Sequence, residues 1–383
     1  MISSNEEEIL ILDAVRKWLK KDVAPYAHDL EQADEYPHQM VEQMKEIGLF
    51  GATILPEYGG LGLSASTYSK IVAAVSEVWM SLSGIFNSHL IMARCVQSYG
   101  TEAQKEKWLP RFASGELRGG IGLTEPDAGT DLQGIRCVAR KDGDYYVVNG
   151  NKAWITNSLE GDVIGLLVKT DPDASPPRRG MSMFIAMKGP GFNVTRKLKK
   201  LGYKGIDTAE ISFEDYRVHK DCLIGGVEGQ GFYNAVGGLE LGRINVAARG
   251  VGVATAALKQ ATAYSQQRKT FGKPICEHQA IQLKLGEMAT RTEAARLLLE
   301  QAAQAFDRGE RCDMEAGMAK YFATEAAAKN ADENMRIHGA YGYSCEFDVE
   351  RLYRDAPLMI IGEGTNEMQR IIIARQLIER NPI

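Results

Sequence analysis

Apolar positions in the N-terminal part of the chain recur every three or four residues. Since such residues share one face of an α-helix, they predict amphipathic helices. The spaced residues are Ile9, Leu12, Val15 and Leu19, and then Met40, Met44 and Ile47. The stretch 56–62 is rich in proline and glycine and predicts a loop, whereas 65–100 is again mostly helical.

From about residue 121 the pattern changes to short β-prone runs. Tyr145–Val148 and Trp154–Thr156 flank Asn149-Gly150, a pair typical of a two-residue hairpin turn, so we expect two strands joined at that pair. Further strands are predicted at 163–168, 181–187, 209–213 and 216–218, with a surface loop at 171–177.

After about residue 232 the chain favours helices again. Apolar residues at steps of roughly 3.5 are typical of a helix in a bundle. They are Ile281, Leu285, Met288, Ala295, Leu299, Ala302 and Phe306. We therefore predict an α+β, mostly α chain with an N-terminal helical domain (1–120), a middle β domain (121–231) and a C-terminal helical bundle (232–383).

Composition agrees with a soluble globular protein. The chain has 383 residues, 44% of them hydrophobic and 25% charged, which is enough for two or three domains with a large core. The formal net charge of −5 gives no strongly basic surface, so we expect no nucleic-acid partner.

The sequence favours a cytoplasmic location. No apolar run approaches the roughly 20 residues of a membrane-spanning helix, so we expect no membrane segment. The N-terminus, MISSNEEEIL, is acidic where a secretory signal is basic and then apolar. The six cysteines are scattered without a CxxC pair, as is typical of reduced thiols.

Several familiar motifs are missing or incomplete. The run 249–254 (RGVGVA) superficially resembles a dinucleotide-binding fingerprint, but it follows no predicted strand, and we interpret its small residues as a helix-packing surface. Neither a GxSxG elbow nor a GxxxxGK[ST] loop occurs, so a hydrolase has no support. Glu277-His278 lacks the second histidine of HExxH and the histidines form no cluster, so we expect no metal site.

Three stretches combine polar groups with glycine, proline or tryptophan. LTEPDAGTD (123–131) is more than a bland connecting turn, since two threonines flank its Glu-Pro pair. Trp154, in WITN (154–157), is either a core residue or part of a site. IGEGTNE (361–367) holds Glu363 between two glycines, which indicates either a helix cap or a base that a ligand can approach closely.

Together these stretches resemble the acyl-CoA dehydrogenase family over nearly the whole chain. The matching segments are LTEPDAGTD (123–131), AWITN (153–157), GLELGR (238–243), RKTFGK (268–273), IHGAYGY (337–343), LYRDA (352–356) and GEGTNEMQR (362–370). The resemblance implies an N-terminal α domain, a middle β domain and a C-terminal four-helix bundle. It also implies FAD as the cofactor, an acyl-CoA substrate, an electron-transfer flavoprotein as partner and a homotetramer.

By the same resemblance, two groups of residues bind FAD. Those that line the isoalloxazine are Leu123, Thr124, Trp154 and Thr156, with Trp154 stacked beside the ring. Those that reach the neighbouring subunit's FAD are Arg268, Thr270, Phe271, Gln279, Arg336, Gly339 and Ala340, and Thr365 and Glu367 complete the set. The family usually has Gln where this chain has Arg336, and Gly where it has Ala340; an arginine beside a diphosphate is electrostatically favourable.

The implied acyl-CoA residues are Thr130, Glu240, Arg243 and Gly364. Arg243 and Thr130 match positions at the adenosine and the pantetheine arm, where a guanidinium suits a phosphorylated nucleotide. Glu240 is either an acid at the pantetheine or a partner in a helix-surface ion pair. The helix residues expected near the acyl tail are Phe86, Asn87, His89 and Leu90.

Glu363 matches the family's catalytic base. Some relatives place the base just before the arginine of GLELGR, but that position is Gly242 here and cannot serve. The implied reaction is α,β-dehydrogenation of the thioester to the trans-2-enoyl-CoA. The base removes the α-proton, hydride passes from Cβ to flavin N5, and the electrons then go to the electron-transfer flavoprotein.

Several alternatives stay open from sequence alone. An acyl-CoA oxidase, a dehydrogenase of carrier-protein-bound acyl groups and a flavin monooxygenase can share the fold, whereas the net charge argues against a DNA-binding relative. The acyl group is not identified. Arg94 either pairs with a terminal carboxylate or is an ordinary surface or interface arginine, and Ser83 stands where glutaryl-type relatives carry their substrate-binding arginine.

Overall fold

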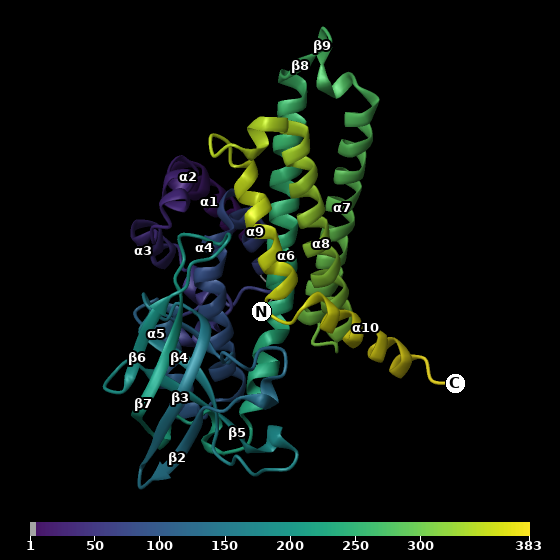
Figure 1. Cartoon of the computed structure of the whole chain (residues 1–383). Coiled ribbons are helices and arrows are strands. Elements are labelled where there is room, and N and C mark those ends of the chain that lie inside the picture. Colours follow the sequence, from purple (N-terminus) through teal and green to yellow (C-terminus); the bar gives the residue numbers. More distant parts are fainter. Residues whose placement is uncertain (1–4) are drawn as a thin grey trace.

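Helices form both ends of the chain and a β-sheet forms its middle (Figure 1). The computed structural model describes residues 5–383. The first four residues of the acidic N-terminus therefore lie outside the described residues. The N-terminal helices are α1 (Asn5–Trp18), α2 (Ala24–Ala33), α3 (His38–Glu46), α4 (Ala65–Tyr99) and α5 (Glu102–Ala113).

Helix α4 is the apolar centre of this part. It begins after Ser64, whose side chain accepts a hydrogen bond from the Thr67 backbone N–H at 3.1 Å. It contains an 18-residue window with a mean hydropathy of 1.2, long and apolar enough to span a membrane, so the prediction that no such run exists is wrong. However, 72% of that window is buried in the protein, as in the core helix of a globular fold.

The middle of the chain folds into one sheet. Its strands are β1 (Gly119–Gly122), β2 (Val138–Asp142), β3 (Tyr145–Thr156), β4 (Val163–Lys169), β5 (Met181–Met187), β6 (Phe192–Lys197) and β7 (Thr208–His219). They lie in the order β1-β4-β2-β3-β7-β6, and β5 pairs with β4. The sheet carries its own core of aromatic and branched side chains, among them Phe184 and Phe213.

The predicted turn at Asn149-Gly150 is wrong. Strand β3 runs straight through these residues, and the hairpin to β2 turns at 143–144 instead. Gly150 lies at an irregularity in the β3–β7 pairing with φ of 141°, where an added Cβ would come within 2.7 Å of Cys137. The glycine therefore marks a β-bulge with close backbone packing. The two strands predicted at 209–213 and 216–218 are likewise one strand, β7.

The C-terminal part is a bundle of long helices. They are α6 (Gly231–Gln267), α7 (Gln279–Asp307), α8 (Asp313–His338), α9 (Val349–Ile361) and α10 (Asn366–Arg380). The prediction of continuous helix missed a small hairpin, β8 (Lys269–Thr270) with β9 (Lys273–Pro274), which joins α6 to α7. In Figure 1 this hairpin lies at the end of the molecule opposite to the sheet.

Helix α6 packs closely against α4 on one side and α8 on the other. A Cβ added at Gly252 would lie 2.4 Å from the Ala73 carbonyl oxygen on α4, and one at Gly250 would lie 2.8 Å from the Ala323 backbone on α8. The interpretation of RGVGVA as a helix-packing surface is therefore confirmed.

We predict that Gly252→Ala destabilises the fold by about 1–3 kcal/mol, because the new methyl group meets backbone that cannot move alone. Gly286→Ala is the matched control: nothing lies within 4 Å of its added Cβ, and it should be neutral or stabilising. Thermal and urea unfolding of both variants measure the effect. Equal midpoints for the two variants would contradict the packing argument.

Candidate active site

The glycine-flanked carboxylate lies in a tight turn between two helices. Helix α9 ends at Ile361, and α10 begins after Thr365, whose side chain accepts from the Met368 backbone N–H at 3.4 Å. Between them Glu363 has a φ of +54° and Gly364 a φ of +87°. Few non-glycine residues adopt this region, and they gather at functional sites. The helix cap is thus Thr365, which leaves the Glu363 carboxylate free for another role.

The Glu363 carboxylate is partnered on one oxygen only. Its Oε1 accepts from Asn87 Nδ2 on α4 at 3.0 Å, whereas Oε2 is buried without a hydrogen-bond partner in the structure. On α6 an added Cβ at Gly242 would lie 2.4 Å from that Oε2. Gly242 therefore leaves the space that the carboxylate occupies.

Burial raises the pKa of Glu363 above its ordinary value. Three features act against this rise: the nearby charges of Arg249 and Lys320, and the hydrogen bond from Asn87. A partly buried carboxylate with raised proton affinity and one oxygen free of hydrogen bonds has the properties of a general base.

Lys320 holds the turn that carries Glu363. Its Nζ, on α8, donates to the Gly364 carbonyl at 2.9 Å, to the Asn366 side chain at 2.8 Å and to the Ile360 carbonyl at 3.2 Å. Burial lowers the pKa of Lys320 to about 8. The sequence analysis missed this residue; its only signal is a lysine on an otherwise alanine-rich face of α8.

A second part of the site lies on the sheet. Trp154 has a φ of +62° at a bulge in β3 and exposes 60% of its surface, so the interpretation of this residue as core is wrong. Beside it, the buried Lys152 donates to the Leu123 carbonyl at 2.9 Å and to Glu125 at 2.8 Å. Glu125 in turn accepts from the backbone N–H of Cys137 at 3.0 Å. This network ties the 123–137 loop to β3, the strand that carries Trp154.

The sheet and the base meet through α4. Asn157, at the end of the WITN stretch, donates from Nδ2 to the Ile85 carbonyl at 2.7 Å and to the Gly119 carbonyl at 2.8 Å. Ile85 is two residues before Asn87, which holds Glu363. The strand end that carries Trp154 and Thr156 is therefore anchored next to the base.

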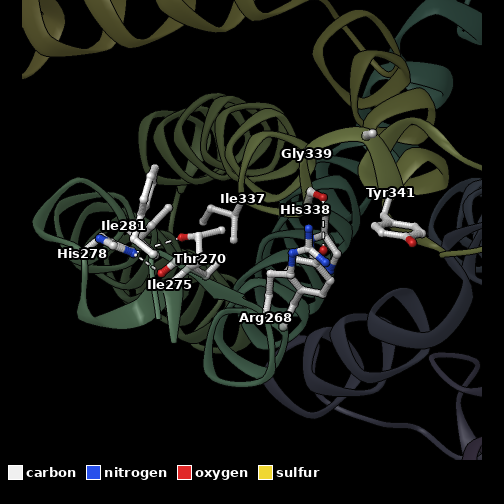
Figure 2. Close-up of a pocket in the computed structure, with 12 residues that line it drawn as sticks. Arg268, Thr270, Ile275, His278, Ile281, Ile337, His338, Gly339 and Tyr341 are labelled. Atoms are coloured by element: carbon white, nitrogen blue, oxygen red, sulfur yellow. Dashed lines mark hydrogen bonds between the residues drawn. The ribbon is translucent and has the colours of Figure 1, made fainter. Parts of the chain in front are cut away.

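A third group of predicted residues lies elsewhere. Arg268, Thr270, Phe271, Gly339 and Ala340 line one cavity of about 430 Å³ near the β8–β9 hairpin (Figure 2). Within it, Thr270 Oγ1 and His278 Nε2 are 3.1 Å apart. Figure 1 places this hairpin and the sheet at opposite ends of the chain. Within a single chain, the residues that line this cavity are therefore separate from the sheet that carries Trp154.

Two predicted residues of this group do not line the cavity. Gln279 is exposed at the start of α7, and Arg336 Nε donates to Asp332, one turn earlier on α8, at 2.8 Å. Phe271 and Gly339, by contrast, line the cavity and leave open surface there. Phe271 is 97% exposed at a φ of +49°, and nothing lies within 4 Å of a Cβ added at Gly339. An exposed aromatic ring and open backbone suit a flat, phosphorylated cofactor such as FAD.

The residues implied for acyl-CoA lie in varied surroundings. Arg243 is largely buried, 3.5 Å from Asp313. Burial and the neighbouring Asp313 raise the pKa of Glu240. Thr130 is exposed on the loop after β1, and the exposed Glu367 pairs with Arg370 at 3.0 Å.

Two residues of α4 lie apart from Glu363. The Arg94 guanidinium lies 5.7 Å from the centre of the Phe306 ring. His89 is buried between Phe50 and Phe112 and bonds the Phe112 carbonyl at 3.0 Å, so the expectation that it approaches the acyl tail is wrong.

The described chain contains no group of three or more histidine, cysteine or acidic side chains arranged to hold a metal ion. All six cysteines are free thiols.

Comparison with known proteins places these features in a family. Family models match the chain in order: the N-terminal domain of acyl-CoA dehydrogenase over 5–116, the middle domain over 120–216 and the C-terminal domain over 229–378. An acyl-CoA dehydrogenase of Bacillus subtilis (strain 168) is 40% identical over 97% of this chain and 98% of its own. The (2S)-methylsuccinyl-CoA dehydrogenase of Cereibacter sphaeroides is 39% identical over 98% of this chain and 70% of its own.

Comparison with solved structures agrees with these sequence matches. A chain in the structure described as the electron transferring flavoprotein of Acidaminococcus fermentans superposes with a TM-score of 0.95 at 36% identity, covering 99% of both chains. The order of helices, sheet and helices is thus confirmed, as is the resemblance seen in the motifs. The chain belongs to the acyl-CoA dehydrogenase family, the FAD-dependent oxidoreductases that act on the CH–CH bonds of acyl-CoA thioesters.

Proposed function

We propose that this protein oxidises the Cα–Cβ bond of an acyl-CoA thioester to the trans-2-enoyl thioester, with Glu363 as the base. The observation that carries the proposal is the half-partnered carboxylate: Oε1 is held by Asn87, and Oε2 is buried without a partner. FAD, when bound, would supply the acceptor for the hydride from Cβ, which carries both electrons of the oxidation.

The chain's own residues prepare the substrate for proton loss. Glu363 Oε2 takes the α-proton. The Glu363 backbone N–H, just beyond the end of α9, is the donor that we assign to the thioester carbonyl as negative charge builds on it. Asn87 and Lys320 keep the carboxylate and its turn in place, so the base needs little reorganisation during the reaction.

We assign the flavin ring to the surface formed by Leu123, Thr124, Trp154 and Thr156. Trp154 covers one side of that surface and excludes water from it. The distal part of the same FAD is held by the Arg268–Phe271 and Arg336–Ala340 segments of a second copy. The cavity near the β8–β9 hairpin supports this assignment, because in Figure 1 the hairpin lies at the end opposite to the sheet, whose strand β3 carries Trp154.

We propose a homotetramer built as a dimer of dimers, which the proposed sharing of FAD sites and a set of exposed apolar side chains support. Large apolar side chains are exposed on α7 at Leu283 and Leu297 and on α10 at Leu377 and Ile378. Surface of this kind marks an interaction site in soluble proteins.

The CoA moiety is assigned to Thr130, Glu240, Arg243 and Gly364. Arg243 supports this, because its buried Nη1 makes no hydrogen bond and has only an ion pair with Asp313 at 3.5 Å. We assign an electron-transfer flavoprotein as the acceptor, which the match to the Acidaminococcus fermentans structure supports. Free thiols throughout are consistent with a cytoplasmic location.

Glu363→Gln should slow flavin reduction by an acyl-CoA at least about 10²–10⁴-fold, because only the proton acceptor is removed. FAD content and acyl-CoA binding should persist, since shape and backbone are kept. Anaerobic stopped-flow bleaching of the flavin and a spectral titration measure the two effects. Glu379→Gln, an exposed carboxylate on α10, is the control. Wild-type bleaching by the Glu363 variant would remove it as the base and direct attention to Glu240.

The rate of flavin reduction should rise with pH, because Glu363 must be unprotonated to accept a proton. Burial raises the pKa of Glu363 from 4.5, so the midpoint of this rise should lie above pH 4.5. Asn87→Leu removes a bond to the charged form and should move the midpoint to higher pH. Gln43→Leu, whose side chain contacts Trp18 instead, should not. The same midpoint in both variants, measured by pH-jump stopped flow, would contradict the assignment.

If FAD spans two copies of the chain, a variant that damages one part of the FAD site should be complemented by a variant that damages the other part. Trp154→Ala and Arg268→Ala should each lose flavin and activity as separate proteins. Co-expression of the two variants should restore part of both, because a mixed dimer contains one undamaged site. The measurement is flavin content and activity of the purified mixture, with mixtures of each variant with itself as controls. A mixture no better than its parts would show that one chain holds FAD alone.

A further inference from the structure

The space around Glu363 is lined by polar side chains that the proposed reaction does not use. They come from α4, from the loop before β7 and from α6: Tyr68, Tyr203, Asn245 and Arg249. Gly242, Asn245 and Arg249 are three, then four, residues apart on α6 and so share one helical face. Because Gly242 abuts Glu363 Oε2, this face of α6 forms a wall of the same site.

Most of these polar groups form hydrogen bonds with one another or with neighbouring residues. Asn245 Nδ2 donates to the Tyr68 hydroxyl at 2.9 Å, and Tyr68 donates to Asn87 Oδ1 at 3.4 Å. The Tyr203 hydroxyl lies against α4, where a Cβ at Gly84 would be only 1.4 Å away. The Tyr203 backbone N–H donates to Asp355 at 2.6 Å. The wall is therefore built in a fixed shape.

The exceptions are Asn245 Oδ1 and two nitrogens of Arg249, and Arg249 leaves more atoms without a partner. Arg249 is 4% exposed, and Nη1 donates a long 3.3 Å hydrogen bond to the Tyr203 hydroxyl. Its Nε and Nη2 are buried without a hydrogen-bond partner in the structure. A guanidinium carries five donors in a planar fork, and leaving them unpaired in a protein interior is costly. These unpaired donors are arranged to bind a hydrogen-bond acceptor on a ligand.

Arg249 forms an ion pair with Glu363, but this ion pair does not satisfy the hydrogen-bond donors of the guanidinium. Its Nη2 is 4.0 Å from Glu363 Oε1, beyond hydrogen-bond distance, and that oxygen is already held by Asn87. The charge of Arg249 also lowers the pKa of Glu363, which weakens a base. An anion bound to the guanidinium would cancel that charge and restore the proton affinity of Glu363.

We propose that Arg249 binds a carboxylate at the distal end of the acyl group, so that the substrate is a short dicarboxylyl thioester. The inference rests on the proposed function, because it places the acyl group beside the base. A planar fork matches a carboxylate through two parallel hydrogen bonds. Since Nη2 is 4.0 Å from the base that takes the α-proton, only a few bonds separate Cα from this carboxylate. Succinyl and glutaryl groups have that size.

The test begins with the wild-type holoenzyme. Anaerobic flavin reduction is measured with succinyl-CoA and glutaryl-CoA, beside the methyl ester of glutaryl-CoA and the alkyl thioesters butyryl-CoA and pentanoyl-CoA. A site built around buried donors rejects a ligand that lacks the acceptor, so kred/Kd should favour a dicarboxylyl thioester by at least about a hundredfold. Equal or faster reduction by the alkyl thioesters overturns this inference and leaves the proposed function standing. A flavin that no thioester reduces overturns both.

Variants of Arg249 then test whether its guanidinium causes the preference for dicarboxylyl thioesters. Arg249→Met should reduce the ratio of dicarboxylyl to alkyl kred/Kd by at least about tenfold, and Arg249→Lys should keep part of it, since charge remains without the fork. Arg351→Met is the matched control, a buried arginine that donates to the Val78 carbonyl away from Glu363, and its ratio should equal that of wild type. An Arg249→Met protein that loses rate equally on both thioester classes overturns the inference. If that variant does not fold, the wild-type panel decides.

Discussion

The constraint on which the rest of the site depends is a partly buried carboxylate, that of Glu363, with only one oxygen hydrogen-bonded. A charged group loses its hydration in such a place, so the protein must hold it from several directions. Asn87 on α4 holds Oε1, and Lys320 on α8 holds the turn through the Gly364 carbonyl. The remaining oxygen is left bare beside Gly242 on α6. Three helices thus meet at one residue whose backbone is itself in a sparsely populated conformation.

The packing of the long helices follows from this requirement. Gly252 brings α6 against α4 and Gly250 brings it against α8, so that Asn87 and Lys320 can both reach the same turn. The sheet joins the assembly through Asn157, which anchors its end to α4 two residues before Asn87. Small residues in α6 therefore serve the chemistry indirectly, since larger ones would separate the helices that hold the base.

The sequence predicts the order of elements well because periodicity is a local property. The helical ends, the β middle and the helical nature of RGVGVA are all confirmed. Features that depend on contacts between residues far apart in the sequence were predicted wrongly or missed. Gly150 predicts a turn, but the approach of Cys137 makes it a bulge, and Trp154 is exposed because a second bulge turns it out of β3.

The same limit applies to the site. Glu363 stands out in the sequence because glycines flank it. Arg249 and Lys320 do not, because each is one of several polar residues in a long helix that is rich in small side chains. Only the packing of α4, α6 and α8 shows that both lie beside Glu363 and that the Arg249 guanidinium keeps unpaired donors.

The most direct test of this account is a crystal structure of the FAD-bound Glu363→Gln protein with glutaryl-CoA. The account predicts that Cα of the acyl group faces the side chain at position 363 and that the distal carboxylate lies within hydrogen-bond distance of Arg249 Nη2. An acyl group that points away from α6, with Cα nearest to Glu240 and Arg249 still bonded to Tyr203 alone, would contradict it.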